Sequence, residues 1–178
     1  MWVSEIADTV AGEHTEGGSR PVVDVPPDRW HEAMRLARDE AGCDFFDWLS
    51  AVDERDDGMR LVVHVWSLEA KRGMLVRSLS VEPTFDSIVD IYPGAAWHER
   101  ETHEMFGIDF PGHPGLTPLL LAPEFEGNPL RKDFVLASRV AKPWPGAKEP
   151  GGDQGTRKRR PVQPPGVPDG WLQDDGTD

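Results

Sequence analysis

The sequence predicts an α+β domain in which a small antiparallel sheet packs with two main helices. Ordered loops rich in proline and glycine follow, and then an extended C-terminal tail. Two segments place apolar residues at helical spacing, and three or four others alternate apolar and polar residues and are rich in β-branched side chains. The chain therefore divides into a disordered lead (residues 1–20), a folded domain (21–137) and a tail (138–178) that is disordered alone and ordered on partners.

The first expected strand is the segment PVVDV (residues 21–25), which two prolines end. Asp28 is a plausible N-cap for the helix that follows and runs to residue 41. Its apolar residues recur at one helical face, which indicates a core-facing helix rather than a cofactor site; they are Trp30, Ala33, Met34, Ala37 and Ala41. Gly42 supplies the left-handed residue that ends the helix.

Three further segments are expected to complete the sheet. Residues 45–52 are apolar and end in a turn-rich stretch, and residues 59–66 and 74–81 are β-branched and roughly alternating. His64 lies inside one of these segments, and we interpret it as a sheet residue with a hydrogen bond rather than as a metal ligand.

The second helix is expected over residues 95–106, closed by Gly107. Trp97, Glu101 and Met105 recur at intervals of four, so Glu101 is expected to project from an apolar stripe and to need a partner. Arg100 and Glu104 form an i, i+4 pair on a neighbouring face. Residues 108–134 carry several leucines between prolines and glycines, which predicts an ordered, packed loop.

The charge balance excludes several classes of partner. The chain has 19 basic and 32 acidic residues and a formal net charge of −13, which argues against nucleic acid and against electrostatic docking on anionic lipid. No apolar run reaches the ~20 residues of a membrane span, and the N-terminal residues lack a signal-peptide pattern. Direct membrane insertion is therefore not expected, and other subunits would hold the protein at a membrane.

The tail differs in charge from the rest of the chain. It carries a net charge of +1 while the remaining 137 residues carry −14, and it contains one basic run, RKRR (residues 157–160). Trp144 and Trp171 are unusual for a linker and suggest anchors on a partner. A flexible terminus with isolated tryptophans is the alternative.

The residues offer little catalytic or metal chemistry. In the segment HERETH (residues 98–103) the second histidine stands at i+5, so it does not share a helical face with the first, and a helical zinc site fails on geometry. No glycine-rich phosphate loop or nucleophile elbow is present. Cys43 excludes an internal disulfide, and an acidic neighbour makes it a poor nucleophile. We therefore expect no catalytic residues, no metal and no bound cofactor.

Three linked motifs carry a resemblance to a known family. The segment WHERETHEMFGI (residues 97–108), the loop FPGHP (110–114) and the segment EGNPLRKDF (126–134) resemble, in order and spacing, signatures of the C subunit of bacterial NADH–quinone oxidoreductase, respiratory complex I. The segment DWLSAVD (47–53) is similar to a further motif of that family, more loosely. The resemblance covers roughly residues 22–140 and is to the stand-alone form of the subunit.

The sequence departs from the family pattern in two places. His103 and Glu104 stand where the family has Tyr-Asp, and Thr117 and Pro118 stand where it has two arginines. These differences favour an alternative, the homologous subunit of a membrane-bound hydrogenase or another ferredoxin-linked complex. A soluble hydrolase that uses Glu99 and His103 is a third hypothesis from a different class.

The resemblance implies an accessory subunit of the peripheral arm, on the cytoplasmic side of the cell membrane. It would contact the D and B subunits in a hetero-oligomer, with the I subunit as a further candidate contact. NADH, FMN, iron–sulfur clusters and quinone would be bound by other subunits. In that picture Glu99, Arg100 and Glu101 connect the helix to the 112–134 loops, where residues 131–133 offer opposite charges. The implied structural and interface residues are Trp97, Glu99, Arg100, Glu101, Glu104, Gly107, His113, Pro114, Pro129, Leu130, Arg131, Lys132 and Asp133.

Overall fold

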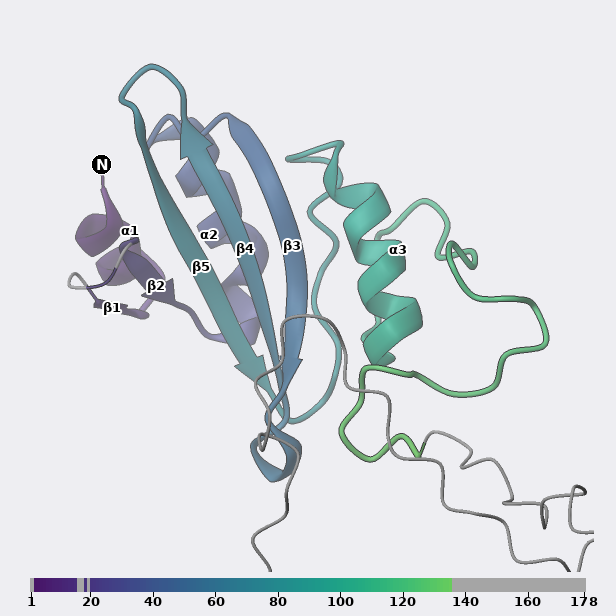
Figure 1. The fold of residues 1–178 in the computed structure, drawn as a ribbon. Helices are drawn as coiled ribbons and strands as arrows, with labels where there is room; N and C mark the ends of the chain where they lie inside the picture. Colours follow the sequence, from purple (N-terminus) through teal and green to yellow (C-terminus); the bar gives the residue numbers. More distant parts are fainter. Residues whose placement is uncertain (1, 16–17, 19, 136–178) are drawn as a thin grey trace, which may run out of the picture. The chain divides into compact units, whose positions relative to one another are not determined.

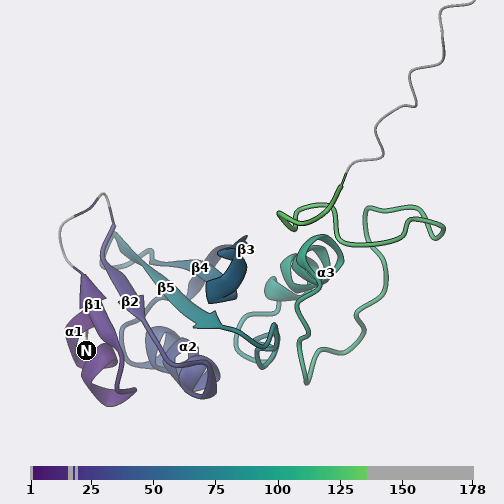
Figure 2. The ribbon, with the colours of Figure 1, turned by 90° about the horizontal axis from the view of Figure 1, so that it is seen from below.

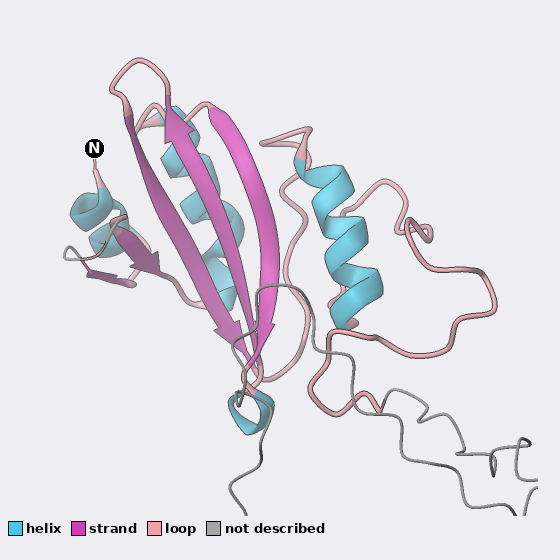
Figure 3. Cartoon of the chain, viewed as in Figure 1, coloured by secondary structure: helices cyan, strands magenta, loops and turns pink. Residues whose placement is uncertain are grey.

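The computed structural model describes residues 2–15, 18 and 20–135, which form one five-stranded sheet with three helices (Figures 1 and 3). The elements are α1 (Val3–Thr9), β1 (Glu13–Thr15), β2 (Val22–Asp24), α2 (Trp30–Asp39), β3 (Phe45–Asp53), β4 (Met59–Ser67), β5 (Arg72–Ser80) and α3 (Ala95–Phe106). The chain divides into two compact units, and the second, residues 139–178, lies outside the described residues. The α+β class predicted from the sequence is confirmed.

The sheet is mixed rather than purely antiparallel. Its strand order is β1-β2-β5-β4-β3, in which β3, β4 and β5 form an antiparallel meander. β2 pairs with β5 in parallel, and β1 adds to β2 in antiparallel orientation. The meander follows from the short turns that join its strands. The direction of β2 is not set by such a turn, because β2 pairs with a strand far along the chain.

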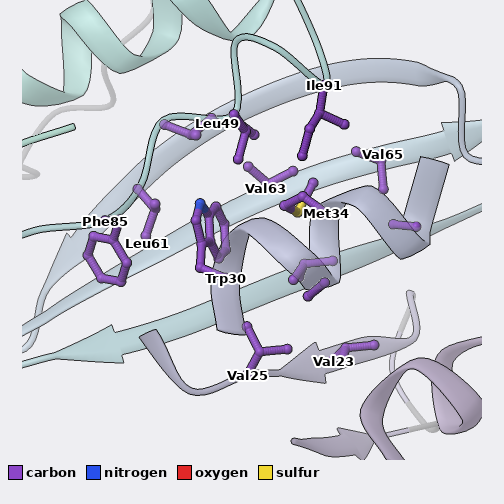
Figure 4. Close-up of a cluster of buried hydrophobic side chains, with 14 of the residues drawn as sticks. Val23, Val25, Trp30, Met34, Leu49, Leu61, Val63, Val65, Phe85 and Ile91 are labelled. Atoms are coloured by element: carbon purple, nitrogen blue, oxygen red, sulfur yellow. The ribbon is translucent and has the colours of Figure 1, made fainter. Parts of the chain in front are cut away.

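The core lies between one face of the sheet and α2. Trp30 and Met34 of α2 are fully buried and point at Leu61, Val63 and Val65 of β4 (Figure 4). Burying side chains of this size contributes about 1.5–3 kcal/mol each. The apolar stripe predicted for this helix is confirmed as core.

The ends of α2 agree with the prediction only in part. Gly42 has φ +69°, and the Cys43 amide donates to the Ala37 carbonyl at 2.9 Å, which closes the helix as predicted. The N-cap prediction is wrong: Asp28 lies in a 3₁₀ turn, Pro27–Arg29, and the N-cap is Arg29. Pro27 is the first residue of this turn, and its fixed φ suits that position.

The prediction of a disordered lead is wrong for residues 2–15. Val3, Ile6 and Val10 are fully buried, so α1 is part of the core cluster. The backbone of the next turn also fits closely, because a Cβ on Gly12 would lie 2.4 Å from the Asp24 carbonyl oxygen. The apolar spacing of this helix covers only seven residues, too few to stand out in an acidic, polar segment.

Helix α3 lies beside β3 at the edge of the sheet, whereas α2 covers a face (Figure 2). His98 connects the two elements, since its Nδ1 lies 3.2 Å from the Leu49 carbonyl oxygen. Among the described residues, none of the helices has the length and apolar character needed to cross a membrane. The residues after α3 run as an irregular segment to residue 135, in contact with α3.

Candidate functional site

The buried face of α3 is not the one predicted from the spacing of its apolar residues. Ala95, Glu99, Thr102 and Phe106 are buried, whereas Trp97 is 65% exposed and Glu101 is exposed. Glu101 makes no hydrogen bond or ion pair with any other described residue, so the prediction that it needs a partner is wrong. The predicted buried face was based on Trp97, because an aromatic residue at helical spacing is usually buried.

Glu99 is the buried carboxylate of this helix. It is 0% exposed, and it accepts hydrogen bonds from the Ser87 hydroxyl at 2.6 Å and from the Ile88 amide at 2.8 Å. Burial raises the pKa of Glu99, although both hydrogen bonds act in the opposite direction. Glu99 therefore fixes the segment before α3, and not the 112–134 loops to which it was expected to connect.

Arg100 and Glu104 hold the segment after the helix. The Arg100 guanidinium donates to the carbonyl oxygens of Thr117 and Pro118 at 2.9 and 2.8 Å. Glu104 accepts from the three amides that follow, those of Leu119, Leu120 and Leu121, at 3.2, 2.8 and 2.9 Å. We call this arrangement the 117–121 clamp. The two side chains were predicted to pair with each other, and both instead bond to the backbone of one five-residue loop.

The pKa of Glu104 reflects these contacts. Desolvation alone would raise it, but the amides of the clamped loop, together with the charge of Arg100, lower the pKa of the carboxyl below its ordinary value. Glu99 and Glu104 thus lie on one helix with pKa shifts of opposite sign. The difference arises because Glu99 is fully buried, while three backbone donors converge on Glu104 near the surface.

Gly107 ends α3 and allows a close approach at the same time. Its φ is +74°, and a Cβ there would lie 2.8 Å from the Asn128 side-chain oxygen. The Asn128 amide donates to the Glu104 carbonyl oxygen at 2.9 Å, and the Leu130 amide donates to the Met105 carbonyl oxygen at 3.0 Å. The C-terminus of α3 is therefore capped by the segment that contains Asn128, Pro129 and Leu130.

His113 connects the loop after α3 to the start of the helix. Its Nε2 donates to the Ala96 carbonyl oxygen at 3.1 Å, which leaves Nδ1 to accept from the Gly115 amide at 2.9 Å. Pro114, between these two residues, is exposed. His113 thus links the loop after α3 to the first turn of the helix.

Arg131, Lys132 and Asp133 lie at the end of β3 and do not pair with the carboxylates of α3 as expected. The Lys132 amide donates to Asp53 at 2.7 Å, and the Arg55 amide donates to the same carboxylate at 2.7 Å. These two hydrogen bonds lower the pKa of Asp53, which is 7% exposed. A concave site of about 400 Å³ is lined by these residues and by Asp56.

Asp53 is a structural residue that the sequence analysis did not single out. It is the last residue of the segment DWLSAVD, so the resemblance of that segment to a family motif could have indicated its structural role. The contact is made by the Lys132 backbone amide and not by a basic side chain, so the charges of Arg131 and Lys132 do not indicate it. Arg131 itself lies 3.4 Å from Asp133, a partly exposed pair of small energetic value.

The histidines of the HERETH segment do not converge on a common point. His98 contacts the backbone of β3, and His103 Nδ1 donates to the Ile108 carbonyl oxygen at 2.8 Å. No hydrogen bond joins Glu99 to His103 in the part of the chain that the structure describes, so the hydrolase hypothesis finds no assembled pair. Within the described residues there is also no group of three potential metal ligands.

Two other predicted features have a defined environment. His64 is buried in β4 and contacts Asp47 through Nδ1 at 2.8 Å, which confirms its interpretation as a hydrogen-bonded sheet residue. Cys43 is buried, and burial raises the pKa of its thiol to about 11. Trp144, Trp171 and residues 157–160 lie outside the described residues, and the predictions made for them stay predictions.

Several large apolar side chains of α3 and of the segment after it are exposed. They are Trp97, Leu120, Phe125, Leu130 and Val135. Phe125 stacks on Phe134 with ring centroids 5.8 Å apart, and Arg100 lies over the Trp97 ring. Exposed aromatic and apolar groups beside an arginine are typical of a protein–protein interface rather than of a small-molecule active site. This part of the molecule thus has the composition of a protein–protein interface.

Comparison with known proteins identifies the class to which the chain belongs. Residues 23–140 match the family described as respiratory-chain NADH dehydrogenase, 30 Kd subunit. The chain therefore belongs to this family, that of the C subunits of complex I, and the resemblance stated from the sequence motifs is confirmed.

The individual relatives carry matching names. The chain is 41% identical over 133 residues to the C subunit of NADH-quinone oxidoreductase from Rhodobacter capsulatus, a match that covers 72% of this chain and 63% of the relative. It is 37% identical over 138 residues to the C subunit from Salinispora tropica, 56% of whose length is matched. A fused C/D subunit from Acidiphilium cryptum is also 37% identical over 138 residues, which are 23% of that protein. The chain thus spans less than two thirds of the length of these relatives.

Two solved structures share the fold. The trypsin-resistant fragment (1-134) of Nqo5 is 24% identical with a TM-score of 0.57, and the match covers 64% of this chain and 96% of the fragment. A chain of the membrane-bound sulfane sulfur reductase, an archaeal respiratory membrane complex, is 26% identical with a TM-score of 0.62. That match covers 76% of this chain and 84% of the other.

Proposed function

We propose that this chain is an accessory subunit in the peripheral arm of a proton-translocating NADH–quinone oxidoreductase. The observation that carries the proposal is the family match over residues 23–140. In this role the chain binds no cofactor and performs no catalytic step. NADH, FMN, iron–sulfur clusters and quinone are bound by other subunits, and this chain supports the arrangement of the subunits that carry electrons.

The geometry of the motif residues supports a structural role. Glu99, Arg100, Glu104 and His113 direct their polar atoms at the chain's own backbone or at Ser87. Groups engaged in this way fix loops in place, and they are not available to bind a substrate. The exposed apolar side chains on the same elements are then the groups that contact other subunits.

The proposed partners are the D and B subunits of the complex, with the I subunit as a further candidate. Relatives in which C and D form one chain support the contact with D, because fusion is compatible with subunits that lie side by side. The contacts with B and I rest on the family resemblance. We propose a location on the cytoplasmic side of the cell membrane, where association with these subunits holds the chain.

Deletion and complementation of the gene test this function. Membranes of the deletion strain are expected to lose NADH–quinone activity, and the peripheral arm is expected not to assemble, as measured by native gel and by mass spectrometry of the detergent-extracted complex. Expression of the full chain is expected to restore both. An arm that assembles and remains active without this chain would contradict the proposal.

A second candidate is a homologous subunit of another respiratory membrane complex. It is favoured by the similarity to a chain of the sulfane sulfur reductase complex, and by Thr117 and Pro118 at the positions where the family pattern has arginines. Proteins that co-purify with the full chain from mild-detergent membranes decide between the candidates. NADH- and flavin-binding subunits support the first, and a nickel-site large subunit or a sulfur-reducing subunit supports the second.

A further inference from the structure

A groove of about 360 Å³ opens between the C-terminal half of α3 and residues 116–128. The helix contributes His103, Glu104 and Gly107 to one wall. The other wall is mostly apolar, and it includes Leu116, Pro118, Leu121, Ala122, Pro123 and Phe125. The shape and composition of this groove suit an inserted side chain, and neither the family match nor the relatives' names assign it a role.

The walls of the groove are held in place before any partner binds. The 117–121 clamp fixes one end of the loop to α3, and Asn128 bonds to the Glu104 carbonyl oxygen at 2.9 Å. The Phe125 ring stacks on the Phe134 ring. A preorganised groove loses little conformational entropy on binding, which favours its use as a docking site.

The polar groups in the groove are already engaged. Glu104 accepts three backbone hydrogen bonds, His103 Nδ1 donates to a carbonyl oxygen, and the Asn128 amide donates to another. A polar metabolite would find few free partners among these groups. The groove therefore favours an apolar side chain, for which the apolar wall supplies the contact.

The rim of the groove beside Phe125 is acidic. Glu124 and Glu126 alternate along the chain with the lining residues Pro123, Phe125 and Gly127. Both are exposed, and neither makes an ion pair with another described residue. Arg100 also reaches the groove, but its guanidinium is engaged by the carbonyl oxygens of Thr117 and Pro118. Residues 116–128 contain no lysine or arginine. Positive charge on a binding segment would complement this rim and speed the encounter, and the rim itself repels acidic surfaces, including anionic lipid.

We infer that the groove is the docking site for a segment of another protein of the complex, in which a large apolar side chain is flanked by lysine or arginine. The apolar side chain lies against Leu121 and Phe125, and the basic residues face Glu124 and Glu126. This inference rests on the proposed function and deepens it, because it specifies the chemistry of the partner segment.

Site-specific photo-cross-linking in cells tests this inference on the full chain. Replacing Phe125, which is 42% exposed, by p-benzoylphenylalanine places the reactive group at the groove. The expected product is a cross-link to a partner peptide with a lysine or arginine within a few residues of an apolar attachment point. The same replacement at Val81, an apolar residue 78% exposed at the end of β5, is the control and is expected not to give this peptide.

Charge reversal on the rim supplies a second measurement. The double variant Glu124→Lys, Glu126→Lys is expected to lower the yield of the Phe125 cross-link about tenfold, because two exposed attractive pairs become repulsive. The matched control Glu69→Lys, Glu82→Lys reverses two exposed charges outside the groove and is expected to leave the yield unchanged. Equal yields from both double variants would overturn the inference.

The outcomes separate this inference from the proposed function. A cross-link to an acidic or uncharged peptide, to lipid or to a second copy of this chain would overturn the groove assignment. Absence of a cross-link in a complex that is assembled and active would do the same, and the proposed function would stand. The proposed function is tested separately by the deletion strain, in which no cross-linker is present.

Discussion

Two regions of this molecule are stabilised in different ways. The sheet and α2 are held by apolar side chains buried on helical and strand periodicities, with Trp30 and Met34 at the centre. The segment after α3 is held by charged side chains that bond to backbone groups, as in the 117–121 clamp. The first region therefore determines whether the domain folds, and the second determines which surface the folded domain presents.

The largest effect is expected in the sheet region. Trp30→Ala removes a fully buried indole and is expected to lower the free energy of unfolding by about 3–5 kcal/mol. Urea denaturation followed by circular dichroism measures this change. Trp97→Ala is the matched control, because the same substitution at a side chain 65% exposed is expected to cost less than about 1 kcal/mol. Equal losses in the two variants would contradict the division between the regions.

A smaller and local effect is expected in the clamp. Glu104→Ala leaves the amides of Leu119, Leu120 and Leu121 without their acceptor. Hydrogen bonds to a charged group contribute about 1.5–3 kcal/mol, so these amides are expected to exchange hydrogen about 10–100 times faster. Amides of β4 are expected to exchange at the wild-type rate, which hydrogen-exchange mass spectrometry or NMR will show. A clamp coupled to global stability would instead speed exchange throughout the sheet.

A pH-dependent effect is expected from Glu99, whose pKa is raised by burial. Because the folded state binds this proton more tightly than the unfolded state, Glu99 makes the protein less stable as the pH rises from the ordinary glutamate pKa of about 4.3 through the raised value. Asp53 and Glu104 have lowered pKa values, so their stabilisation is present above the ordinary pKa and is lost as the pH falls through the lowered one.

The variant Glu99→Gln isolates the first contribution. It cannot titrate, so its stability relative to wild type is expected to improve as the pH increases, with His113 and Asp90, which also influence the Glu99 carboxyl, left in place. Urea denaturation at a series of pH values measures the difference. A difference that stays constant with pH would show that the Glu99 carboxyl titrates normally in the folded state.

The sequence predicted the first region better than the second, and the reason is physical. The α2 stripe and the ends of both main helices at Gly42 and Gly107 follow from periodicity and from backbone geometry, which are local properties. α1 was missed because its apolar pattern is short. The partners of Glu99, Arg100 and Asp53 were missed because each bonds to backbone groups, which every residue carries and no side-chain pattern reveals.

The smallest effect is expected at Glu101, and it tests that reasoning directly. If the Trp97–Glu101–Met105 stripe faced the core, Glu101→Ala would remove a buried charge and cost about 3–5 kcal/mol. The structure instead exposes Glu101 without a partner among the described residues, and a surface substitution of this kind stays within about 0.5 kcal/mol. Thermal and urea denaturation of Glu101→Ala distinguishes the buried from the exposed arrangement. Hydrogen exchange of Glu101→Ala beside Glu104→Ala is the control, since only Glu104→Ala is expected to alter exchange of the 119–121 amides. A large loss of stability in Glu101→Ala would mean that α3 is rotated relative to the sheet and that Glu101 faces the core.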